Sequence, residues 1–272
     1  MNTSHVMLNN GYSLPVLGMG VFKINASQEM EHAVSWAFEA GYRLFDTAQM
    51  YGNESLLGNA LKSTGISRET YFLTSKLEPA SSHDPESVFL KTLDDLNTDY
   101  LDLFMIHWPG QQKERLIHVW HQLEALQKRG LVRSLGVCNC TIDHLRWILE
   151  NCENPPSVHQ VEHHPLLNEI ELYEFCRKRG IQLQAWAPLM RGNLDHPVLQ
   201  AMAHRYDKSV AQIILRWDIQ QGFAVIPKSV HRERIFQNAD IFDFALSPED
   251  IALLNSLHSG QHSGKDPYQY DY

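Results

Sequence analysis

The sequence lacks several features that mark whole classes of protein. No apolar run reaches the roughly 18 residues of a transmembrane helix. The first twelve residues, MNTSHVMLNNGY, lack the basic-then-apolar layout of a signal peptide. The four cysteines contain no CxxC pair, which argues against a zinc or dithiol redox site. We therefore expect a cytoplasmic protein whose thiols are free.

Positive charge is also scarce. The 272 residues carry 23 Lys and Arg against 32 Asp and Glu, which gives a formal net charge of −9. Duplex DNA and anionic membranes attract the opposite sign, so we expect neither a nucleic acid nor a membrane as a partner. An anionic ligand must instead meet a local cluster of cations.

The composition is otherwise that of an ordinary folded protein, because 43% of the residues are hydrophobic and 20% are charged. No Gly/Ser-rich linker and no internal repeat divides the chain. We therefore expect a single domain over residues 1–272, a length that one α/β barrel fills. No apolar stripe stands out as a contact surface, and we expect a monomer.

Short apolar runs alternate with segments of helical periodicity. The runs are typical of parallel strands covered on both faces, and they lie at residues 42–46, 71–75, 101–106, 132–137, 158–161, 181–186, 223–226 and 241–245. The segments between them carry apolar stripes at helical spacing, and several end at a glycine, which favours helices. Eight strands with intervening helices predict an α/β fold of the (β/α)8 TIM-barrel type, with an open doubly wound sheet as the alternative.

The two ends of the chain differ from this pattern. An Asn-Gly pair at residues 10–11 stands between short apolar pieces, which predicts an N-terminal β-hairpin that can plug one end of a barrel. Residues 259–272 are polar and aromatic without any period, which predicts a short C-terminal tail. We expect this tail, with loops near Met50 and Gln111, to set substrate specificity, and its closure over the pocket is a hypothesis.

Polar and aromatic side chains stand where the predicted strands end. Asp46 ends the first predicted strand and Tyr51 follows five residues later, while Lys76 follows the second strand and His107 the third. Each has an ordinary alternative: Asp46 as a helix cap, Lys76 as a solvated loop residue, and the two rings as core side chains. Catalytic groups of a barrel stand at the carboxyl ends of its strands, so their joint occurrence favours an active site.

Longer segments around these residues resemble the signatures of the aldo-keto reductases. The segment GYRLFDTAQMYGNE at residues 41–54 is similar to the first signature of that family. Five more follow in the family's order: TSKL at 74–77, IHWP at 106–109, GVCN at 136–139, QVEHHP at 160–165 and IPKS at 226–229. The resemblance covers nearly the whole chain and is greatest to bacterial members such as the 2,5-diketogluconate reductases.

The resemblance implies an NADP-dependent reductase of aldehydes and ketones, such as small dicarbonyls, keto-sugars and aromatic aldehydes. It places the catalytic residues at Asp46, Tyr51, Lys76 and His107. Tyr51 then gives a proton to the carbonyl oxygen, and the ammonium of Lys76 lowers the pKa of that phenol. Asp46 holds Lys76 charged, and His107 orients the carbonyl as a neutral imidazole.

The cofactor implied is NADP(H), which carries the hydride. Asn139 and Gln160 then bind the carboxamide, Trp186 stacks on the nicotinamide, and Lys228 and Arg234 suit a ribose 2′-phosphate. The full implied cofactor set is Gly20, Val21, Asp46, Cys138, Asn139, Gln160, Trp186, Ala187, Pro188, Leu189, Ile226, Pro227, Lys228, Ser229, Arg234, Gln237 and Asn238. The implied substrate set is Phe22, Met50, Tyr51, His107 and Trp108.

Some positions depart from expected patterns. The Rossmann fingerprint is absent, because Gly18-Met19-Gly20 lacks a third glycine, and we expect these glycines to let the backbone approach the nicotinamide. Cys138 and Ala187 stand where the family commonly has serine, and Gln237 stands where it often has glutamate. These departures weaken the expected preference for NADP but leave the reaction unchanged.

Three other functions are compatible with parts of the sequence. Lys76 could be the Schiff-base nucleophile of an aldolase, although pairing with Asp46 would keep it protonated. His107, His163 and His164 could hold zinc, but neighbouring strand residues point to opposite faces, so we expect no metal. The third is a nucleotide-binding sensor with the same fold and little turnover.

Overall fold

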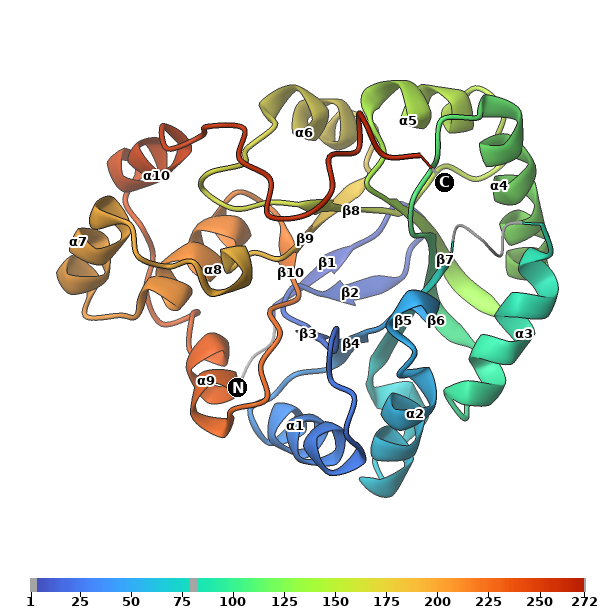
Figure 1. Cartoon of the computed structure of the whole chain (residues 1–272), viewed down its shortest axis with the longest axis horizontal. Coiled ribbons are helices and arrows are strands. Elements are labelled where there is room, and N and C mark those ends of the chain that lie inside the picture. Colours follow the sequence, from blue (N-terminus) through green and yellow to red (C-terminus); the bar gives the residue numbers. More distant parts are fainter. Residues whose placement is uncertain (1–3, 79–82, 272) are drawn as a thin grey trace.

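The structure, a computed structural model, describes residues 4–78 and 83–271 and is an eight-stranded parallel barrel ringed by helices (Figure 1). The strand order is β10-β9-β8-β7-β6-β5-β4-β3. The strands are β3 (Met19–Gly20), β4 (Leu44–Asp46), β5 (Phe72–Leu77), β6 (Leu101–Ile106), β7 (Val132–Cys138), β8 (Val158–Glu162), β9 (Gln182–Trp186) and β10 (Ala224–Val225), with β1 (His5–Met7) and β2 (Ser13–Pro15) forming a separate antiparallel hairpin.

The helices lie between the strands and after the last one. They are α1 (Ser27–Glu39), α2 (Glu54–Ser63), α3 (Pro85–Asp95), α4 (Lys113–Lys128), α5 (Ile142–Leu149), α6 (Ile170–Arg177), α7 (Pro197–Tyr206), α8 (Val210–Gln220), α9 (Arg232–Ala239) and α10 (Pro248–Asn255). The predicted capping box of α8 is present: Ser209 Oγ accepts from the Gln212 N–H, and Gln212 Oε1 accepts from the Ser209 N–H. The four cysteines are free, as predicted.

The sheet closes on itself between β3 and β10, which confirms the predicted (β/α)8 barrel over the open sheet. The Gly18 N–H donates to the Val225 carbonyl and the Val225 N–H donates to the Val16 carbonyl, both at 2.8 Å. A Cβ on Gly20 would lie 2.9 Å from the Ile226 carbonyl oxygen, so glycine is needed for the two backbones to come this close. Barrel closure therefore explains the glycine at position 20, and the expected approach of this backbone to the nicotinamide stays a prediction.

One of the eight predicted strands is wrong. Residues 241–245 form no strand and bend at 242–243, and the eighth strand is β3, which precedes the first strand predicted. Ile241 is apolar because it is fully buried in the core, while its carbonyl accepts from Arg216 Nη1 at 3.1 Å. The two-residue strand β3 contains a glycine and is too short to produce the apolar run expected of a buried strand.

The predicted hairpin is present and plugs the N-terminal end of the barrel. Leu8 and Leu14 are buried against side chains of the barrel interior, among them Leu44 and Leu103. The turn is also tied to the barrel, because Ser157 Oγ donates to Asn9 Oδ1 at 2.7 Å just before β8 begins. The open end is therefore the one where the parallel strands finish.

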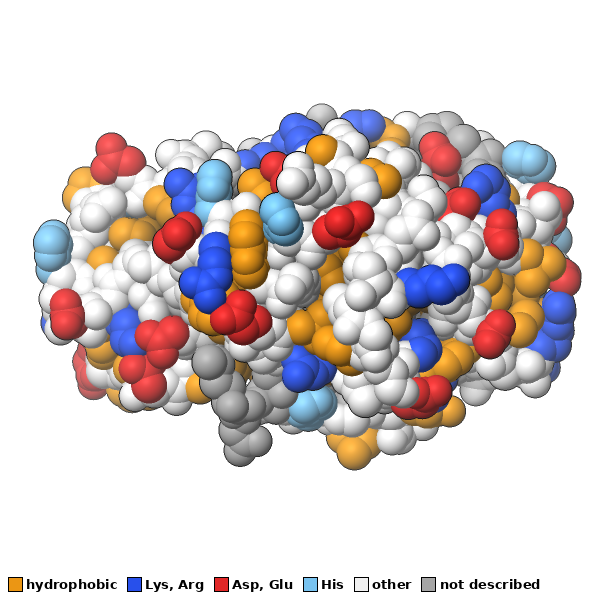
Figure 2. All heavy atoms as spheres, turned by 90° about the horizontal axis from the view of Figure 1, so that it is seen from below, with side chains coloured by type: hydrophobic (Ala, Val, Ile, Leu, Met, Phe, Trp, Pro, Cys, Tyr) orange, Lys and Arg blue, Asp and Glu red, His pale blue; other side chains and the backbone are white. Residues whose placement is uncertain are grey.

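The surface is charged without a dominant sign on the face that Figure 2 shows, where Lys and Arg are interspersed with Asp and Glu. In the part of the chain that the structure describes, no helix is long and apolar enough to cross a membrane.

Candidate active site

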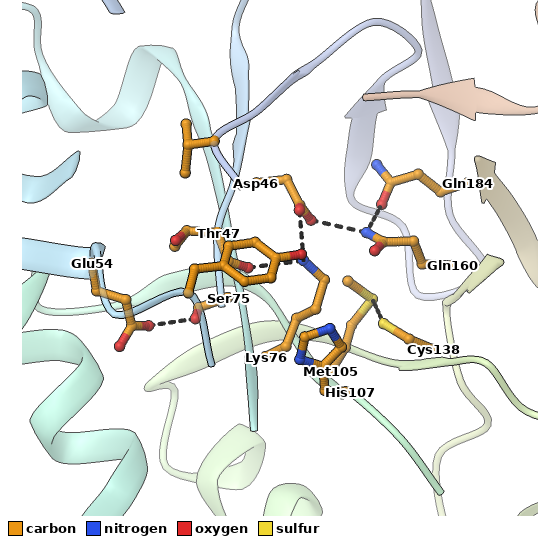
Figure 3. Close-up of polar contacts among 12 residues, drawn as sticks. Asp46, Thr47, Glu54, Ser75, Lys76, Met105, His107, Cys138, Gln160 and Gln184 are labelled. Carbon is orange, nitrogen blue, oxygen red and sulfur yellow. Dashed lines mark hydrogen bonds and ion pairs between the residues drawn. The ribbon is translucent and has the colours of Figure 1, made fainter. Parts of the chain in front are cut away.

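The carboxyl ends of three neighbouring strands bring the predicted catalytic residues together. Asp46 ends β4, Lys76 lies near the end of β5 and His107 follows β6, while Tyr51 ends a short 3-10 helix, η1 (Gln49–Tyr51). Lys76 Nζ lies 2.5 Å from Asp46 Oδ1 and donates to Tyr51 Oη at 3.4 Å. The rings of Tyr51 and His107 meet edge to face with centroids 5.7 Å apart. Figure 3 shows the His107 ring beside Lys76.

Lys76 and Asp46 form a buried ion pair, with side chains 0% and 1% exposed. Lys76 Nζ also donates to the Thr47 carbonyl at 2.9 Å (Figure 3). Burial alone would lower the pKa of Lys76, but the charges and hydrogen bond of its neighbours, Asp46 first among them, together outweigh burial and raise that pKa. An ammonium held in this way is not a nucleophile, which counts against a Schiff-base aldolase.

The phenol of Tyr51 is a protonated acid at neutral pH. Burial raises its pKa and Lys76 lowers it, and the net result is a pKa of about 12. The expected lowering effect of Lys76 is present, but burial, which the sequence did not predict, outweighs it. Tyr51 therefore has a proton to donate, and Lys76 reduces the energy needed to release it.

His107 is a neutral imidazole, as the resemblance implied. Burial lowers its pKa well below the usual value, and the nearby Lys76 ammonium lowers it further. Its Nδ1 is buried and has no hydrogen-bond partner among the residues described. Asn139 Nδ2 donates to the His107 carbonyl at 3.0 Å, which ties the end of β6 to the end of β7.

The turn that carries Tyr51 is fixed by Asn53, a role that sequence reasoning missed. Asn53 is fully buried, and its Nδ2 donates to the carbonyls of Val21 and Ile24 at 2.9 and 3.0 Å. Its Oδ1 accepts from Thr47 Oγ1 at 3.0 Å. An Asn two residues after the tyrosine in the first signature was the available signal.

Gln160 and Asn139 lie at the open end of the barrel, where the resemblance places the carboxamide. Gln160 Nε2 donates to Asp46 Oδ2 at 2.9 Å and to Gln184 Oε1 at 2.8 Å (Figure 3). Its Oε1 accepts no hydrogen bond from the residues described, so it is available to an amide donor. Gln184, which fixes this orientation, was not predicted from the sequence. Asn139 Oδ1 accepts from Trp186 Nε1 at 2.8 Å, which links the indole predicted to stack on the nicotinamide to a residue of the proposed carboxamide site.

Two exposed cations stand beyond β10. Neither Lys228 nor Arg234 makes a hydrogen bond or ion pair with any residue in the described ranges. Ser229 between them is buried, and its Oγ accepts from the His231 N–H at 3.1 Å. Unpaired cations at the start of α9 fit a phosphate group, which accepts charge-assisted hydrogen bonds.

The remaining predicted cofactor residues divide by exposure. Gly20, Val21, Cys138, Pro188, Ile226, Pro227 and Asn238 are buried, Ala187 and Leu189 are half-buried, and Gln237 is exposed. Ala187 has a φ of 47°, in the left-handed region, which turns the chain sharply after β9.

Apolar side chains form the rim around Tyr51. Phe22 is 44% exposed and Met50 is 43% exposed, although both are large hydrophobic residues. The Phe22 ring lies 4.8 Å from that of Tyr51, and the buried Trp108 follows His107 directly. Of the predicted substrate residues, Phe22 and His107 have rings packed against that of Tyr51, while the role of Met50 and Trp108 stays a prediction.

The adjacent histidines of the zinc alternative have separate partners. His163 Nδ1 lies 2.6 Å from Asp218 Oδ1, and His164 Nε2 lies 3.2 Å from Glu162 Oε1. Across residues 4–78 and 83–271, no group of three or more His, Cys, Asp or Glu could hold a metal ion.

Comparison with known proteins assigns the family. The model of the aldo/keto reductase family matches residues 16–259. Glyoxal reductase of Bacillus subtilis (strain 168) is 45% identical over 265 residues, covering 96% of this chain and 95% of that protein. The crystal structure of an aldo-keto reductase from a Medee basin deep-sea metagenome library matches with a TM-score of 0.94 at 38% identity, covering 98% of this chain and 100% of that one.

A third match was solved with a nucleotide. The Bombyx mori aldo-keto reductase in complex with NADP has a TM-score of 0.92 at 30% identity, and the match covers 100% of this chain and 98% of that one. The chain belongs to the aldo/keto reductase family, as the resemblance implied.

Proposed function

We propose that this protein is an NADPH-dependent reductase that converts small aldehydes and ketones to alcohols, with dicarbonyls and keto-sugars as the substrate class. The observation that carries the proposal is the buried Asp46–Lys76 pair with the phenol of Tyr51 at 3.4 Å from the ammonium. This arrangement suits proton delivery to an oxygen that gains negative charge.

The chemistry divides between the cofactor and the chain. NADPH, when bound, supplies the hydride that reduces the carbonyl carbon. Tyr51 gives its proton to the carbonyl oxygen, and Lys76 stabilises the phenolate left behind. His107, a neutral imidazole, orients the carbonyl oxygen with a hydrogen bond, and Asp46 keeps the ammonium charged and in place.

Residues of this chain fit both ends of NADPH. The unpaired Oε1 of Gln160 and the amide of Asn139 suit the carboxamide, with Trp186 beside them to stack on the ring. Lys228 and Arg234 suit the 2′-phosphate, which distinguishes NADPH from NADH. The departures at Cys138, Ala187 and Gln237 do not change the identity of any of these residues.

The apolar residues near Tyr51 favour a small carbonyl compound as the substrate. Phe22 packs beside Tyr51, and with the exposed Met50 and the buried Trp108 it offers apolar surface against which we expect a two- or three-carbon dicarbonyl to bind. The name of the Bacillus subtilis relative, glyoxal reductase, points to the same class.

The test is the oxidation of NADPH and NADH, measured in parallel by loss of absorbance. The panel is glyoxal, methylglyoxal, 2,5-diketogluconate and an aromatic aldehyde. We expect turnover with NADPH and a higher kcat/KM than with NADH. Binding of NADPH without turnover of any of these carbonyls would contradict the proposal and identify a nucleotide-binding sensor.

A further inference from the structure

The C-terminal tail, defined here as residues 259–271, lies across the open end of the barrel. In Figure 1 it runs, in dark red, from α10 past α6 and β8 towards α5. Its far end is held by Gln111, whose backbone N–H donates to Asp271 Oδ1 and whose Nε2 donates to the Tyr270 carbonyl, both at 3.1 Å. The Tyr270 ring packs on Trp108 with centroids 4.6 Å apart. The tail therefore contacts the predicted wall of the carbonyl pocket.

The near end of the tail is held by one carboxylate, that of Glu162 at the end of β8. Its Oε1 accepts from the Ser263 N–H at 2.7 Å and from the Ser263 hydroxyl. Its Oε2 accepts from the Gly264 N–H at 3.2 Å and lies 3.3 Å from His262 Nδ1. The Glu162 side chain is only 4% exposed, so these contacts replace the water that a carboxylate would otherwise bind.

This carboxylate is ionised at neutral pH. Burial alone would raise the pKa of Glu162, but the hydrogen bonds from His164 and Ser263 outweigh it and hold the pKa at about 2. Hydrogen bonds to an ionised acceptor are roughly twice as strong as neutral ones. The backbone amides of the tail at residues 263 and 264 therefore donate charge-assisted hydrogen bonds to the Glu162 carboxylate.

These bonds place the tail backbone directly on Trp186. A Cβ on Gly264 would lie 2.4 Å from Cη2 of Trp186, so the backbone at 264 is in contact with the indole and only glycine fits. Trp186 Nε1 in turn donates to Asn139 Oδ1 at 2.8 Å. Glu162, Gly264 and Trp186 thus form a continuous chain of contacts that ends at the proposed carboxamide site.

We propose that Glu162 is a positioning residue that latches the tail onto Trp186 and so holds both the stacking ring and the cover of the carbonyl pocket in place. Glu162 contacts neither Tyr51 nor Lys76 in the described structure, and it acts through the tail. The kinetic part of this inference rests on the proposed function, whereas the latch itself does not.

Hydrogen exchange of the full-length chain tests the latch without any turnover. In Glu162→Gln, which keeps the side chain's size, we expect the amides of residues 263 and 264 to exchange at least about tenfold faster. Amides of the N-terminal hairpin serve as the internal reference. Glu169→Gln is the matched control, because Glu169 lines the same hollow beneath the tail and its carboxylate accepts no bond from residues 263–264. Unchanged exchange in Glu162→Gln would overturn the proposal.

Steady-state kinetics test whether the contact between Glu162 and the tail affects binding of the carbonyl substrate. We expect Glu162→Gln to raise the KM for the carbonyl about tenfold while kcat stays within about twofold, and Glu169→Gln to change neither. Gly264→Ala gives an independent variant, because its methyl cannot lie 2.4 Å from Cη2 of Trp186 and so must separate the tail backbone from the indole. It should reproduce the rise in KM even if Glu162→Gln does not fold.

The double variant separates action through the tail from direct action on the site. If Glu162 acts through the tail, Glu162→Gln with Gly264→Ala raises KM no further than one substitution does. Additive increases in KM would mean that Glu162 acts on neighbouring Gln160 directly, and would overturn the proposal. Faster exchange in a chain that reduces no carbonyl would refute the proposed function and leave the latch standing.

Discussion

The properties of the active residues depend on their neighbours, and this limits what sequence can predict. The identities of Asp46, Tyr51, Lys76 and His107 follow from three motifs, and the structure brings them together. The net pKa of Tyr51 does not follow, because the cost of burying a phenolate depends on packing from distant segments such as Phe22. For the same reason the motifs did not predict Asn53, Gln184 or Glu162 as positioning residues.

The buried ion pair of Asp46 and Lys76 leads to a prediction about the stability of the fold. Asp46→Asn leaves the Lys76 ammonium buried without a counter-charge, so we expect a loss of about 3–5 kcal/mol in the free energy of unfolding. Asp95→Asn removes the partner of an exposed lysine, Lys91, and should cost less than about 1 kcal/mol. Urea unfolding of both variants measures the difference, and equal losses would mean that burial does not govern the Lys76 pair.

The pKa of Tyr51 predicts how the rate depends on pH. Reduction needs the protonated phenol, which is lost only as the pH rises towards about 12. We therefore expect kcat for reduction to be flat across the neutral range and kcat for alcohol oxidation, which needs the phenolate, to rise with pH. A loss of reduction with a midpoint near neutral pH would identify a different proton donor.

At the scale of elements, the proposed phosphate site lies at the junction of β10 and α9. We expect Arg234→Ala to raise the Kd of NADPH about tenfold and to leave that of NADH unchanged, because only NADPH carries the 2′-phosphate. Arg232→Ala is the control on the same helix, since Arg232 already pairs with Glu39 at 2.8 Å. Fluorescence titration with both nucleotides measures the constants, and an equal loss of NADPH and NADH affinity would place the phosphate elsewhere.

Element lengths explain which strands could be predicted. Strands such as β6 and β7 span six and seven residues and have mostly buried apolar side chains, so they stand out in the sequence. The closing strand β3 has two residues, and its identity depends on pairing with β4. The apolar run at 241–245 was wrongly predicted to be a strand because a buried loop residue such as Ile241 is as apolar as a strand residue.

At the scale of the whole molecule, the barrel closes only because the backbones of β3 and β10 come into close contact, a junction called here the seam. Gly20→Ala would put a methyl 2.9 Å from the Ile226 carbonyl oxygen. We expect a loss of about 1–3 kcal/mol in the free energy of unfolding, as for other overpacked sites. Thermal unfolding followed by circular dichroism tests this, and an unchanged midpoint would show that the seam can open to admit the methyl.

The proposed mechanism depends on Tyr51 being the proton source, and a substitution can remove the phenol itself. In Tyr51→Phe we expect NADPH to bind with an unchanged Kd while kcat for reduction of glyoxal falls at least about 100-fold. Tyr12→Phe, an exposed tyrosine of the N-terminal hairpin segment, is the matched control and should retain full activity. Glyoxal reduction by Tyr51→Phe at the rate of the unaltered chain would contradict the proposed mechanism.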